Sequence, residues 1–589
     1  MILWRGREWL FGAPTFFSRM TQAYESLKQQ ATARQQALAG KPRVRIGTAL
    51  CGQAAGGLEV ADAFREAARA RSLDATVSQV GCLGLCYAEP LVDLQWPGGP
   101  RVFYGNVSPE EASGLVEAHL VRGQPVWERA LAVSGDGATV SGDVLTLEAL
   151  EMMKGQVRIA LRNAGHIDPA DVHEYIATGG YAGLDRALSG MTPQQVQEMV
   201  GASGLRGRGG AAFPTGTKWR FLMGSPGPVK YILCNCEEGD PGAFNDKGIL
   251  ESDPHTLVEG MILAGYTTGA SNGVIFIRHG HEGPVERAKA AVRDAYGLGL
   301  LGKNILGSSF TFNAEVSLVG ESYVAGEETA LMEAIEGKRS MPRFRPPFPA
   351  AYGVWGKPSN INNVKTLAYV PEIVAKGPTV FSGVGTERSK GTAILCLTGA
   401  IRRPGMMEVP MGMTLHQALE GLAGGAPGGK KIKLLQTGGP LGGVLGGDQL
   451  DVPLDFDAMA RAGAILGSGG IIVADETTCA VDLTRVLMTF CQFESCGKCF
   501  PCRTGMTHMM EVLERICRFQ GESIDLPLLE RVGASMAAGS LCGHGQLGFN
   551  PVRSALRFFG DEFKAHIESK RCPAGVCNGE YLTPQRARR

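Results

Sequence analysis

Residues 204–219 read GLRGRGGAAFPTGTKW, and this glycine-rich basic stretch is the most informative segment of the chain. Five glycines leave few side chains in the loop, so backbone N–H groups can approach a phosphate closely, and Lys218 can add a point charge. Apolar Phe213 and Trp219 flank the polar loop, as a pocket for an aromatic cofactor requires. A surface turn is the alternative, but the composition favours phosphate or nucleotide binding.

The bulk composition indicates a multidomain globular protein. A chain of 589 residues is too long for one hydrophobic core, and 44% hydrophobic with 20% charged residues is ordinary for such a protein. A formal net charge of zero argues against a nucleic-acid partner. No apolar run is long enough for a transmembrane helix, and the N-terminal segment MILWRGREWLFGAP lacks the apolar core of a secretory signal. Fifteen cysteines, several in metal-ligand spacing, indicate reduced thiols and a cytoplasmic location.

Three further motifs follow the glycine-rich loop. YILCNCEEGDPGAFNDK (231–247) reads as a strand that runs into an acidic Pro-Gly loop, an arrangement typical of an α/β binding edge. GESYVAGEETAL (320–331) and WGKPSNINNVKTL (355–367) come next. In this order, the four motifs resemble the NADH-oxidising, FMN- and [4Fe–4S]-binding flavoprotein subunit of respiratory complex I. Relatives of that subunit occur in NAD-linked hydrogenases, formate dehydrogenases and benzoyl-CoA-reductase-type complexes.

The resemblance implies an FMN site built from these motifs. Glycine amides and Lys218 would meet the 5′-phosphate, and asparagine amides can both donate to and accept from the polar groups of the flavin. Flavin is the usual device for taking a hydride and releasing single electrons, so no catalytic proton donor is expected. The FMN residues implied are Gly207, Gly209, Lys218, Asn235, Asn362, Asn363 and Thr366. The acidic and Gly-Glu-Glu-Thr motifs add Glu237, Glu238, Gly326 and Glu327 to the cofactor-binding set.

The resemblance also implies a nicotinamide nucleotide lying over the flavin. Aromatic side chains suit stacking against adenine, although core packing is the alternative for any one of them. The implied positions are Phe213, Lys218, Phe221, Tyr323, Glu328 and Phe348. A carboxylate such as Glu328 that faces the ribose diol should repel a 2′-phosphate, so NAD is favoured over NADP. Asp240 stands where the family usually has glutamate, and its shorter side chain weakens that exclusion.

SCGKCFPCR (495–503) contains a C-x2-C-x2-C motif, a spacing that lets one loop face three corners of a cubane cluster. The resemblance supplies the fourth thiolate from GSLCGHG. A zinc site is the alternative, but [4Fe–4S] is favoured, and the expected ligands are Cys496, Cys499, Cys502 and Cys542. This cluster would take electrons from FMN one at a time.

Residues 41–125 alternate strand and helix patterns and resemble a thioredoxin-like [2Fe–2S] domain. That family uses a C-x4-C pair and a C-x3-C pair. Here Cys82 and Cys86 form the second pair, but Gly56 stands where the partner of Cys51 is expected. A non-cysteine group or another subunit completes the set of four ligands, or the site is degenerate.

The C-terminal segment HIESKRCPAGVCNGE adds cysteines and a histidine outside the cluster motif. We hypothesise a tetrahedral structural zinc bound by Cys491, His566, Cys572 and Cys577, with free thiols as the alternative. Cys479, Cys517, Cys396, Cys234 and Cys236 lie in apolar or strand contexts that indicate buried free cysteines.

The expected fold is therefore a multidomain α/β and α+β chain. It comprises an N-terminal extension (1–40), a thioredoxin-like ferredoxin domain (41–130), a linker with an FMN- and NADH-binding α/β domain (131–387), a ubiquitin-like β-grasp domain (388–475), a helical bundle with the [4Fe–4S] cluster (476–570), and a C-terminal tail (571–589).

The expected function is an NAD(H)-handling diaphorase subunit of a cytoplasmic oxidoreductase complex. A hydride would pass between NAD(H) and FMN, and single electrons between FMN and iron–sulfur clusters, in either direction. The expected partners are a small [2Fe–2S] subunit and a subunit that carries the terminal substrate, because no site for that chemistry is recognised here. The alternatives are a bifurcating subunit that also uses ferredoxin, and a structural electron-transfer subunit with an idle nucleotide site.

Overall fold

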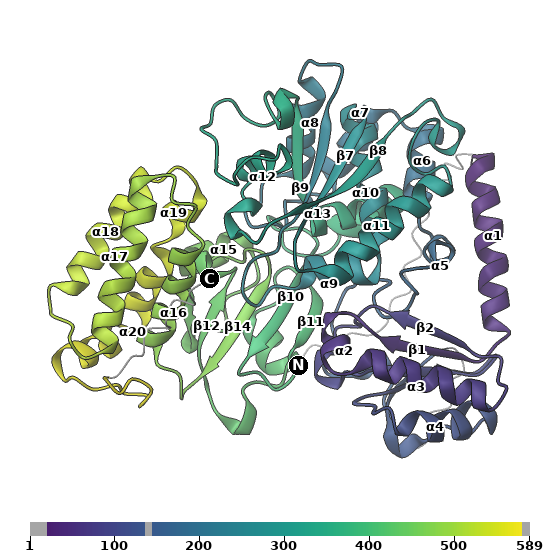
Figure 1. The fold of residues 1–589 in the computed structure, drawn as a ribbon, viewed down its shortest axis with the longest axis horizontal. Coiled ribbons are helices and arrows are strands. Elements are labelled where there is room, and N and C mark those ends of the chain that lie inside the picture. The colour runs from purple at the N-terminus through teal and green to yellow at the C-terminus, as the bar shows by residue number, and fades with distance from the viewer. Residues whose placement is uncertain (1–20, 136–143, 580–589) are drawn as a thin grey trace.

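A computed structural model describes residues 21–135 and 144–579 (Figure 1). The first helix, α1 (Gln22–Ala39), packs against α5 (Val172–Ala177). Its side chains Tyr24, Leu27 and Ala31 belong to the core of the α/β domain. The part of the N-terminal extension that is described is therefore a piece of this domain, whereas residues 1–20 lie outside the described residues.

The thioredoxin-like domain is built on a mixed five-stranded sheet in the order β2-β1-β3-β4-β5. Strand β1 pairs parallel with β2 and antiparallel with β3. The apolar face of α3, with Val60, Ala61 and Phe64, packs into its core. The elements are β1 (Arg43–Gly47), α2 (Leu50–Ala54), α3 (Gly57–Ala70), β2 (Thr76–Val80), β3 (Val92–Gln95), β4 (Arg101–Tyr104), α4 (Glu111–Leu115) and β5 (Ala130–Ser134). Because β5 belongs to this sheet, the domain extends past the expected boundary at residue 130.

The central α/β domain contains a parallel four-stranded sheet in the order β8-β7-β6-β9. Side chains of β6 alternate between two cores: Ile232 and Cys234 face one, and Leu233 faces the other, as the period of two requires. The strands are β6 (Tyr231–Cys236), β7 (Asn272–Arg278), β8 (Asn313–Val319) and β9 (Ser359–Asn363). The helices are α5, α6 (Ala182–Gly190), α7 (Pro193–Ala202), α8 (Thr215–Gly224), α9 (Asn245–Ser252), α10 (Pro254–Thr268), α11 (Glu282–Gly297), α12 (Glu328–Ile335), α13 (Val364–Lys376) and α14 (Thr379–Ser382).

The β-grasp domain follows as a second mixed sheet in the order β11-β10-β14-β12-β13. Its strands are β10 (Thr392–Gly399), β11 (Gly405–Pro410), β12 (Ile432–Thr437), β13 (Val444–Gly446) and β14 (Gly470–Asp475), with helix α15 (Phe456–Ala462). Leu83, Leu85 and Leu150 lie in the same core as its apolar residues. This sheet is thus packed directly against the thioredoxin-like domain.

The C-terminal region is a helical bundle, as the periodicity of the sequence predicts. It contains α16 (Ala480–Phe493), α17 (Phe500–Cys517), α18 (Asp525–Gly539), α19 (Gly543–Leu547) and α20 (Asn550–Glu568). Helix α16 contacts both α17 and α20, and α20 contacts β13 of the β-grasp sheet. The bundle lies at the end of the molecule opposite α1 (Figure 1). None of the described helices combines the length and apolar character that a bilayer crossing needs.

Candidate functional site

The topology of the parallel sheet marks one crevice. The chain runs from β6 outward to β7 and β8 and then returns to place β9 on the other side of β6. Ligands of open α/β sheets bind at such a switch point, beyond the carboxyl ends of the strands. Asn235 and Asn363 are register partners at the carboxyl ends of β6 and β9. Two of the predicted motifs therefore meet where the fold favours a ligand.

The glycine-rich loop lies over the same end of β9. The Arg208 N–H donates to the Thr366 hydroxyl at 2.9 Å, which connects the loop to the first turn of α13. A Cβ atom on Gly209 would lie only 3.0 Å from the Asn363 Cβ, so glycine is needed for this close approach. The Lys218 ammonium donates to the Ile361 carbonyl at 2.6 Å, and burial lowers its pKa.

The donor set at this crevice fits FMN. Close-packed glycines, the Lys218 ammonium and the amides of Asn235, Asn362 and Asn363 are the groups that a phosphate and a polar isoalloxazine edge require. The Asn362 amide oxygen accepts from the Trp219 indole at 3.3 Å, so its orientation is set by α8. The fold thus brings together residues of the first, second and fourth motifs.

The two glutamates of the acidic loop have different roles. The Glu237 carboxylate accepts from Arg278 at 2.9 Å, yet its burial raises its pKa to about 8. The Glu238 carboxylate accepts the backbone N–H groups of Asp246 and Lys247, at 2.7 and 2.8 Å, in the first turn of α9. Burial raises the pKa of Glu238 to about 7. Glu238 therefore orders the loop through α9.

Asp240 and Tyr323 connect the α/β domain to its neighbours. The Tyr323 hydroxyl and the Ser468 hydroxyl each donate to the Asp240 carboxylate at 2.7 Å. Both oxygens of Asp240 are thus engaged. The ring of Tyr323 lies 5.6 Å from that of His544, in the helical bundle. Tyr323, which belongs to the motif at residues 320–331, thus contacts the segment that carries Cys542.

The Gly-Glu-Glu-Thr motif opens helix α12. Glu327 is its N-cap residue, whose carboxylate accepts the N–H groups of Thr329 and Ala330 at 2.9 Å. Glu328 is paired with Arg345 at 2.7 Å and lies 3.6 Å from the Lys218 ammonium. Glu327 thus shapes the site through the helix, and Glu328 faces it.

Three predicted aromatic residues are exposed around this region. Phe213, Phe221 and Phe348 expose 45%, 52% and 60% of their surface. The rings of Phe213 and Phe221 lie 6.3 Å apart. Core packing, the alternative for these side chains, is therefore excluded, and they are accessible for stacking on a ligand.

The four predicted cluster cysteines come together at two helix starts. Cys496, Cys499 and Cys502 lie at the start of α17, and Cys542 is the N-cap residue of α19. Burial, together with the charges of the other three thiolates, raises the pKa of Cys502 to about 12. A Cβ atom on Gly545 would lie 2.8 Å from the Cys502 Cβ, which places α19 tightly against α17. This set of thiolates fits a [4Fe–4S] cluster.

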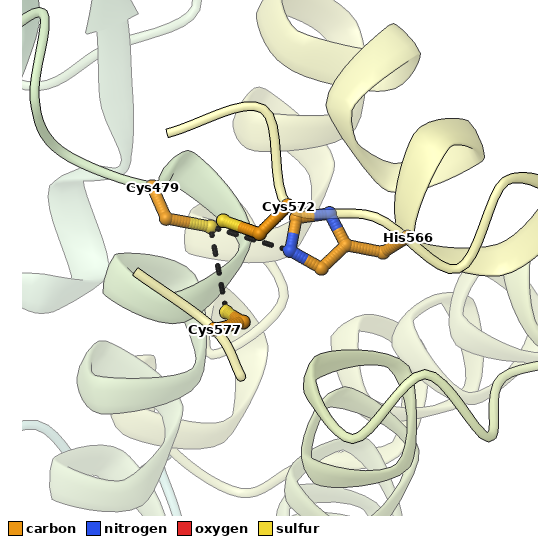
Figure 2. Close-up of side chains that lie close together, drawn as sticks. All are labelled: Cys479, His566, Cys572 and Cys577. Carbon is orange, nitrogen blue, oxygen red and sulfur yellow. Dashed lines mark hydrogen bonds between the residues drawn. The ribbon is translucent and has the colours of Figure 1, made fainter. Parts of the chain in front are cut away.

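The predicted zinc ligand set needs one correction. Figure 2 shows Cys479, His566, Cys572 and Cys577 converging, with all four ligand atoms within 4.8 Å of one another. Cys491 is not in this group. It lies inside α16, where its carbonyl lies 2.9 Å from His544 Nε2, whereas Cys479 is the N-cap residue of α16. The sequence analysis predicted Cys479 as a buried free cysteine, which it is, but did not predict its place beside the tail, because no local spacing relates it to those residues.

The third group of thiols is in the thioredoxin-like domain. The Sγ atoms of Cys51, Cys82 and Cys86 lie within 4.8 Å of one another. The three cysteines expected from the sequence are thus adjacent.

Several site residues escaped the sequence analysis. Arg278 pairs with Glu237, Arg345 pairs with Glu328, and buried Lys365 pairs with Asp246 at 2.9 Å. Of the four residues that the sequence analysis did not assign, Lys365 and Asp246 lie inside quoted motifs. The two arginines come from the end of β7 and from the loop after α12, where no local pattern points to the site.

Comparison with known proteins places these features in a family. Residues 200–372 match the Nuo51 FMN-binding domain, residues 394–445 the SLBB domain, and residues 482–566 the NADH-ubiquinone oxidoreductase-F iron–sulfur binding region. NADP-reducing hydrogenase subunit HndC of Solidesulfovibrio fructosivorans is 46% identical over 424 residues, which cover 72% of this chain and 86% of that protein. The F 2 subunit of the NADH-quinone oxidoreductase of Rhizobium meliloti is 43% identical over 415 residues, covering 70% and 99%.

The structure of an NAD+-reducing [NiFe]-hydrogenase in its H2-reduced state is also similar. It matches with a TM-score of 0.62 and 26% identity over 92% of this chain and 91% of that chain. The fold and the site define a flavin and iron–sulfur electron-transfer protein of the NADH dehydrogenase type. The chain belongs to the family of FMN-binding, iron–sulfur flavoprotein subunits that includes HndC and the F subunits of NADH-quinone oxidoreductases.

Membership of this family confirms the main sequence predictions. The fold class is confirmed, as are an NADH dehydrogenase type of activity, FMN, NAD(H) and one [4Fe–4S] cluster. Electron transfer between NADH, FMN and iron–sulfur clusters is the function of the chain. The zinc ion and the [2Fe–2S] cluster stay predictions, as do the individual ligands of each cofactor.

Proposed function

We propose that this chain is the NAD(H)-handling subunit of a hetero-oligomeric oxidoreductase, with FMN held at the β6/β9 switch point. The observation that carries the proposal is the convergence of the sequence motifs on that crevice, with Tyr323 leading from it to His544. Bound FMN supplies the capacity to take a hydride and release single electrons. The protein contributes binding and orientation, in which the Lys218 ammonium and the glycine amides hold the phosphate.

The nucleotide would lie between the exposed aromatic residues and Glu328. Phe213, Phe221 and Phe348 offer faces for the adenine, and the Glu328 carboxylate accepts hydrogen bonds from the ribose diol. NAD is the proposed nucleotide, because a 2′-phosphate would be repelled by this carboxylate. Asp240 contributes little to this exclusion, since both of its oxygens already accept hydroxyl donors.

The proposed partners are a small [2Fe–2S] subunit and a subunit that carries the terminal substrate. The relatives are named as subunits of larger enzymes, which supports a hetero-oligomer. We place the complex in the cytoplasm, because none of the fifteen cysteines, all of which lie in the described residues, forms a disulfide, as a reducing compartment favours.

A second proposal concerns the tail. Three thiolates and one imidazole at mutual distances within 4.8 Å suit tetrahedral zinc. The His566 Nδ1 lies 2.7 Å from the Glu562 carbonyl, an arrangement that directs Nε2 at the cysteines. We infer that zinc bound by Cys479, His566, Cys572 and Cys577 fastens the tail to α16 and α20.

The electron-transfer proposal is tested with the purified full chain, loaded with FMN and iron. NADH should bleach the flavin absorbance and drive reduction of an artificial dye. Cys542→Ser should slow dye reduction at least tenfold while flavin bleaching persists, since the cluster then lacks a ligand. Cys491→Ser is the matched control and should change neither. No dye reduction by the chain with FMN and iron bound would instead support an idle nucleotide site.

A further inference from the structure

The thioredoxin-like domain holds three cysteines where a [2Fe–2S] cluster needs four protein ligands. Cys51 lies in the first turn of α2, and Cys82 and Cys86 lie in the segment between β2 and β3. The Sγ atoms of Cys82 and Cys86 are 3.7 Å apart. The Gly84 N–H donates to the Cys82 Sγ at 3.2 Å, a contact that stabilises a thiolate. The three cysteines leave one of the four ligand positions unfilled, and this position lies on the side of Cys51.

The position expected for the fourth cysteine cannot easily carry one. Gly56 has φ +93°, a left-handed conformation that L residues rarely adopt. It separates α2 from α3 and turns the chain between them. A cysteine at this corner would therefore be strained, which favours a fourth ligand from another segment.

A buried carboxylate reaches the cysteine group from the loop before β3. Glu89 is only 7% exposed, and its Oε1 lies 3.8 Å from the Cys51 Sγ. Its Oε2 accepts the Leu91 N–H at 2.8 Å, which fixes the rotamer. A Cβ atom on Gly47 would lie 2.6 Å from Oε2, so glycine at position 47 makes room for the carboxylate.

This carboxylate lacks a protein counter-charge. Within residues 21–135 and 144–579, no lysine or arginine lies at ion-pair distance from Glu89. Nearby Asp93, which is equally buried, pairs with Arg45 at 2.7 Å and with Arg101 at 2.6 Å. Burying a carboxylate without a cation is costly, and a bound metal supplies the missing positive charge.

We propose that Glu89 is the fourth protein ligand of a [2Fe–2S] cluster in this domain. Cys51 and Glu89 form one ligand pair, with ligand atoms 3.8 Å apart, and Cys82 and Cys86 form the other, at 3.7 Å. Each pair serves one iron, so Glu89 replaces the cysteine that Gly56 lacks. No other described carboxylate competes for this place: Asp93 is held by two arginines, and Glu251 accepts the Leu50 N–H at 3.1 Å.

The test uses the full chain, purified anaerobically, with iron and acid-labile sulfide counted per chain and an EPR spectrum of the reduced protein. The wild type should hold about six iron atoms, four in the bundle and two in this domain. Cys82→Ser, Glu89→Ala and Glu89→Gln should each lose about two iron atoms and two sulfides. Glu89→Cys should keep them but show a shifted EPR spectrum, because four thiolates then bind the cluster.

Two controls separate ligation from packing. Glu251→Gln removes a buried carboxylate next to Cys51 in space and should leave iron content and the EPR spectrum unchanged. FMN content reports whether the α/β domain is folded, and the protease resistance of residues 41–135 reports whether the thioredoxin-like domain itself is folded in each variant. Full iron content and a wild-type EPR spectrum in folded Glu89→Gln would overturn the proposal. One zinc bound in this domain of the wild type would overturn the proposal as well. Full iron content in Cys82→Ser would also overturn it. None of these readouts depends on NADH oxidation, so failure here is distinct from failure of the proposed function.

Discussion

Asn235 and Asn363 sit opposite each other on adjacent parallel strands, at the carboxyl ends of β6 and β9. Each carries a side-chain amide, and each belongs to a motif that is distant from the other in sequence. The strand order reverses at this point, and ligands of open α/β sheets bind beyond the carboxyl ends of the strands at such a reversal. The glycine-rich loop is attached to the same crevice through Thr366.

Lys218→Met should weaken FMN binding. A charge-assisted hydrogen bond contributes about 1.5–3 kcal/mol, so the dissociation constant should rise roughly tenfold to hundredfold. Flavin fluorescence after dilution and gel filtration measures the retained FMN.

Lys230→Met is the matched control for that experiment. Lys230 is also buried and donates to backbone carbonyls, among them Leu222 at 2.8 Å, but it precedes β6 and lies at the opposite edge of the sheet. It should lower stability without changing the FMN content of folded protein. Equal loss of FMN in both variants would contradict a phosphate contact by Lys218.

Glu328→Gln should relax discrimination against NADPH. The substitution removes the negative charge that faces the ribose and one carboxylate partner of Arg345 and of Lys218, so a 2′-phosphate meets more positive charge. The kcat/KM ratio of NADH to NADPH should fall about tenfold, equivalent to ~1.4 kcal/mol. Glu333→Gln, on the same helix and paired with Arg343, should not alter this ratio. An unchanged ratio in Glu328→Gln would contradict the proposed contact between the Glu328 carboxylate and the ribose.

Glu237 should make the stability of the FMN-free chain pH-dependent. Burial raises its pKa from 4.5 to about 8, so the folded protein binds this proton more tightly than the unfolded chain does. The stabilisation is complete below about pH 4.5 and is lost as the pH rises through about 8. The melting temperature should therefore fall between pH 5 and pH 9 less steeply in Glu237→Gln than in the wild type. If the melting temperatures of the wild type and of Glu237→Gln changed with pH in parallel, that result would contradict the raised pKa of Glu237.

Metal analysis of two cysteine variants tests the corrected ligand set of the tail. Cys479→Ala should abolish bound zinc, because it removes one of four ligands, and should make the tail after His566 sensitive to protease. Cys491→Ala should retain one zinc per chain. Zinc loss in Cys491→Ala alone would restore the ligand set first expected from the sequence, and absence of zinc from iron-replete wild type would remove the site.

The motifs predicted the cofactors because each pairs residue types with a spacing that the chemistry demands. Three cysteines at C-x2-C-x2-C favour a metal centre before any fold is known, and a glycine-rich loop that contains Lys218 favours a phosphate site; the family resemblance then specified [4Fe–4S] and FMN. The same local reasoning did not predict that the Glu238 and Glu327 carboxylates accept backbone N–H groups at the starts of helices α9 and α12. A carboxylate that accepts backbone N–H groups at a helix start and one that binds a cofactor look the same in the sequence. Only the position of the backbone N–H groups in the structure tells the two roles apart.

The sequence by itself determined the order of the domains, the FMN and [4Fe–4S] cofactors and the candidate residues around them, because those signals are local. Tertiary structure alone decided which distant groups meet. It placed Cys479 rather than Cys491 beside His566, brought Arg278 and Arg345 to the acidic residues, and directed the Glu89 carboxylate at Cys51. Those contacts depend on the packing of separate strands and helices, and no spacing along the chain encodes the distance between side chains on different elements.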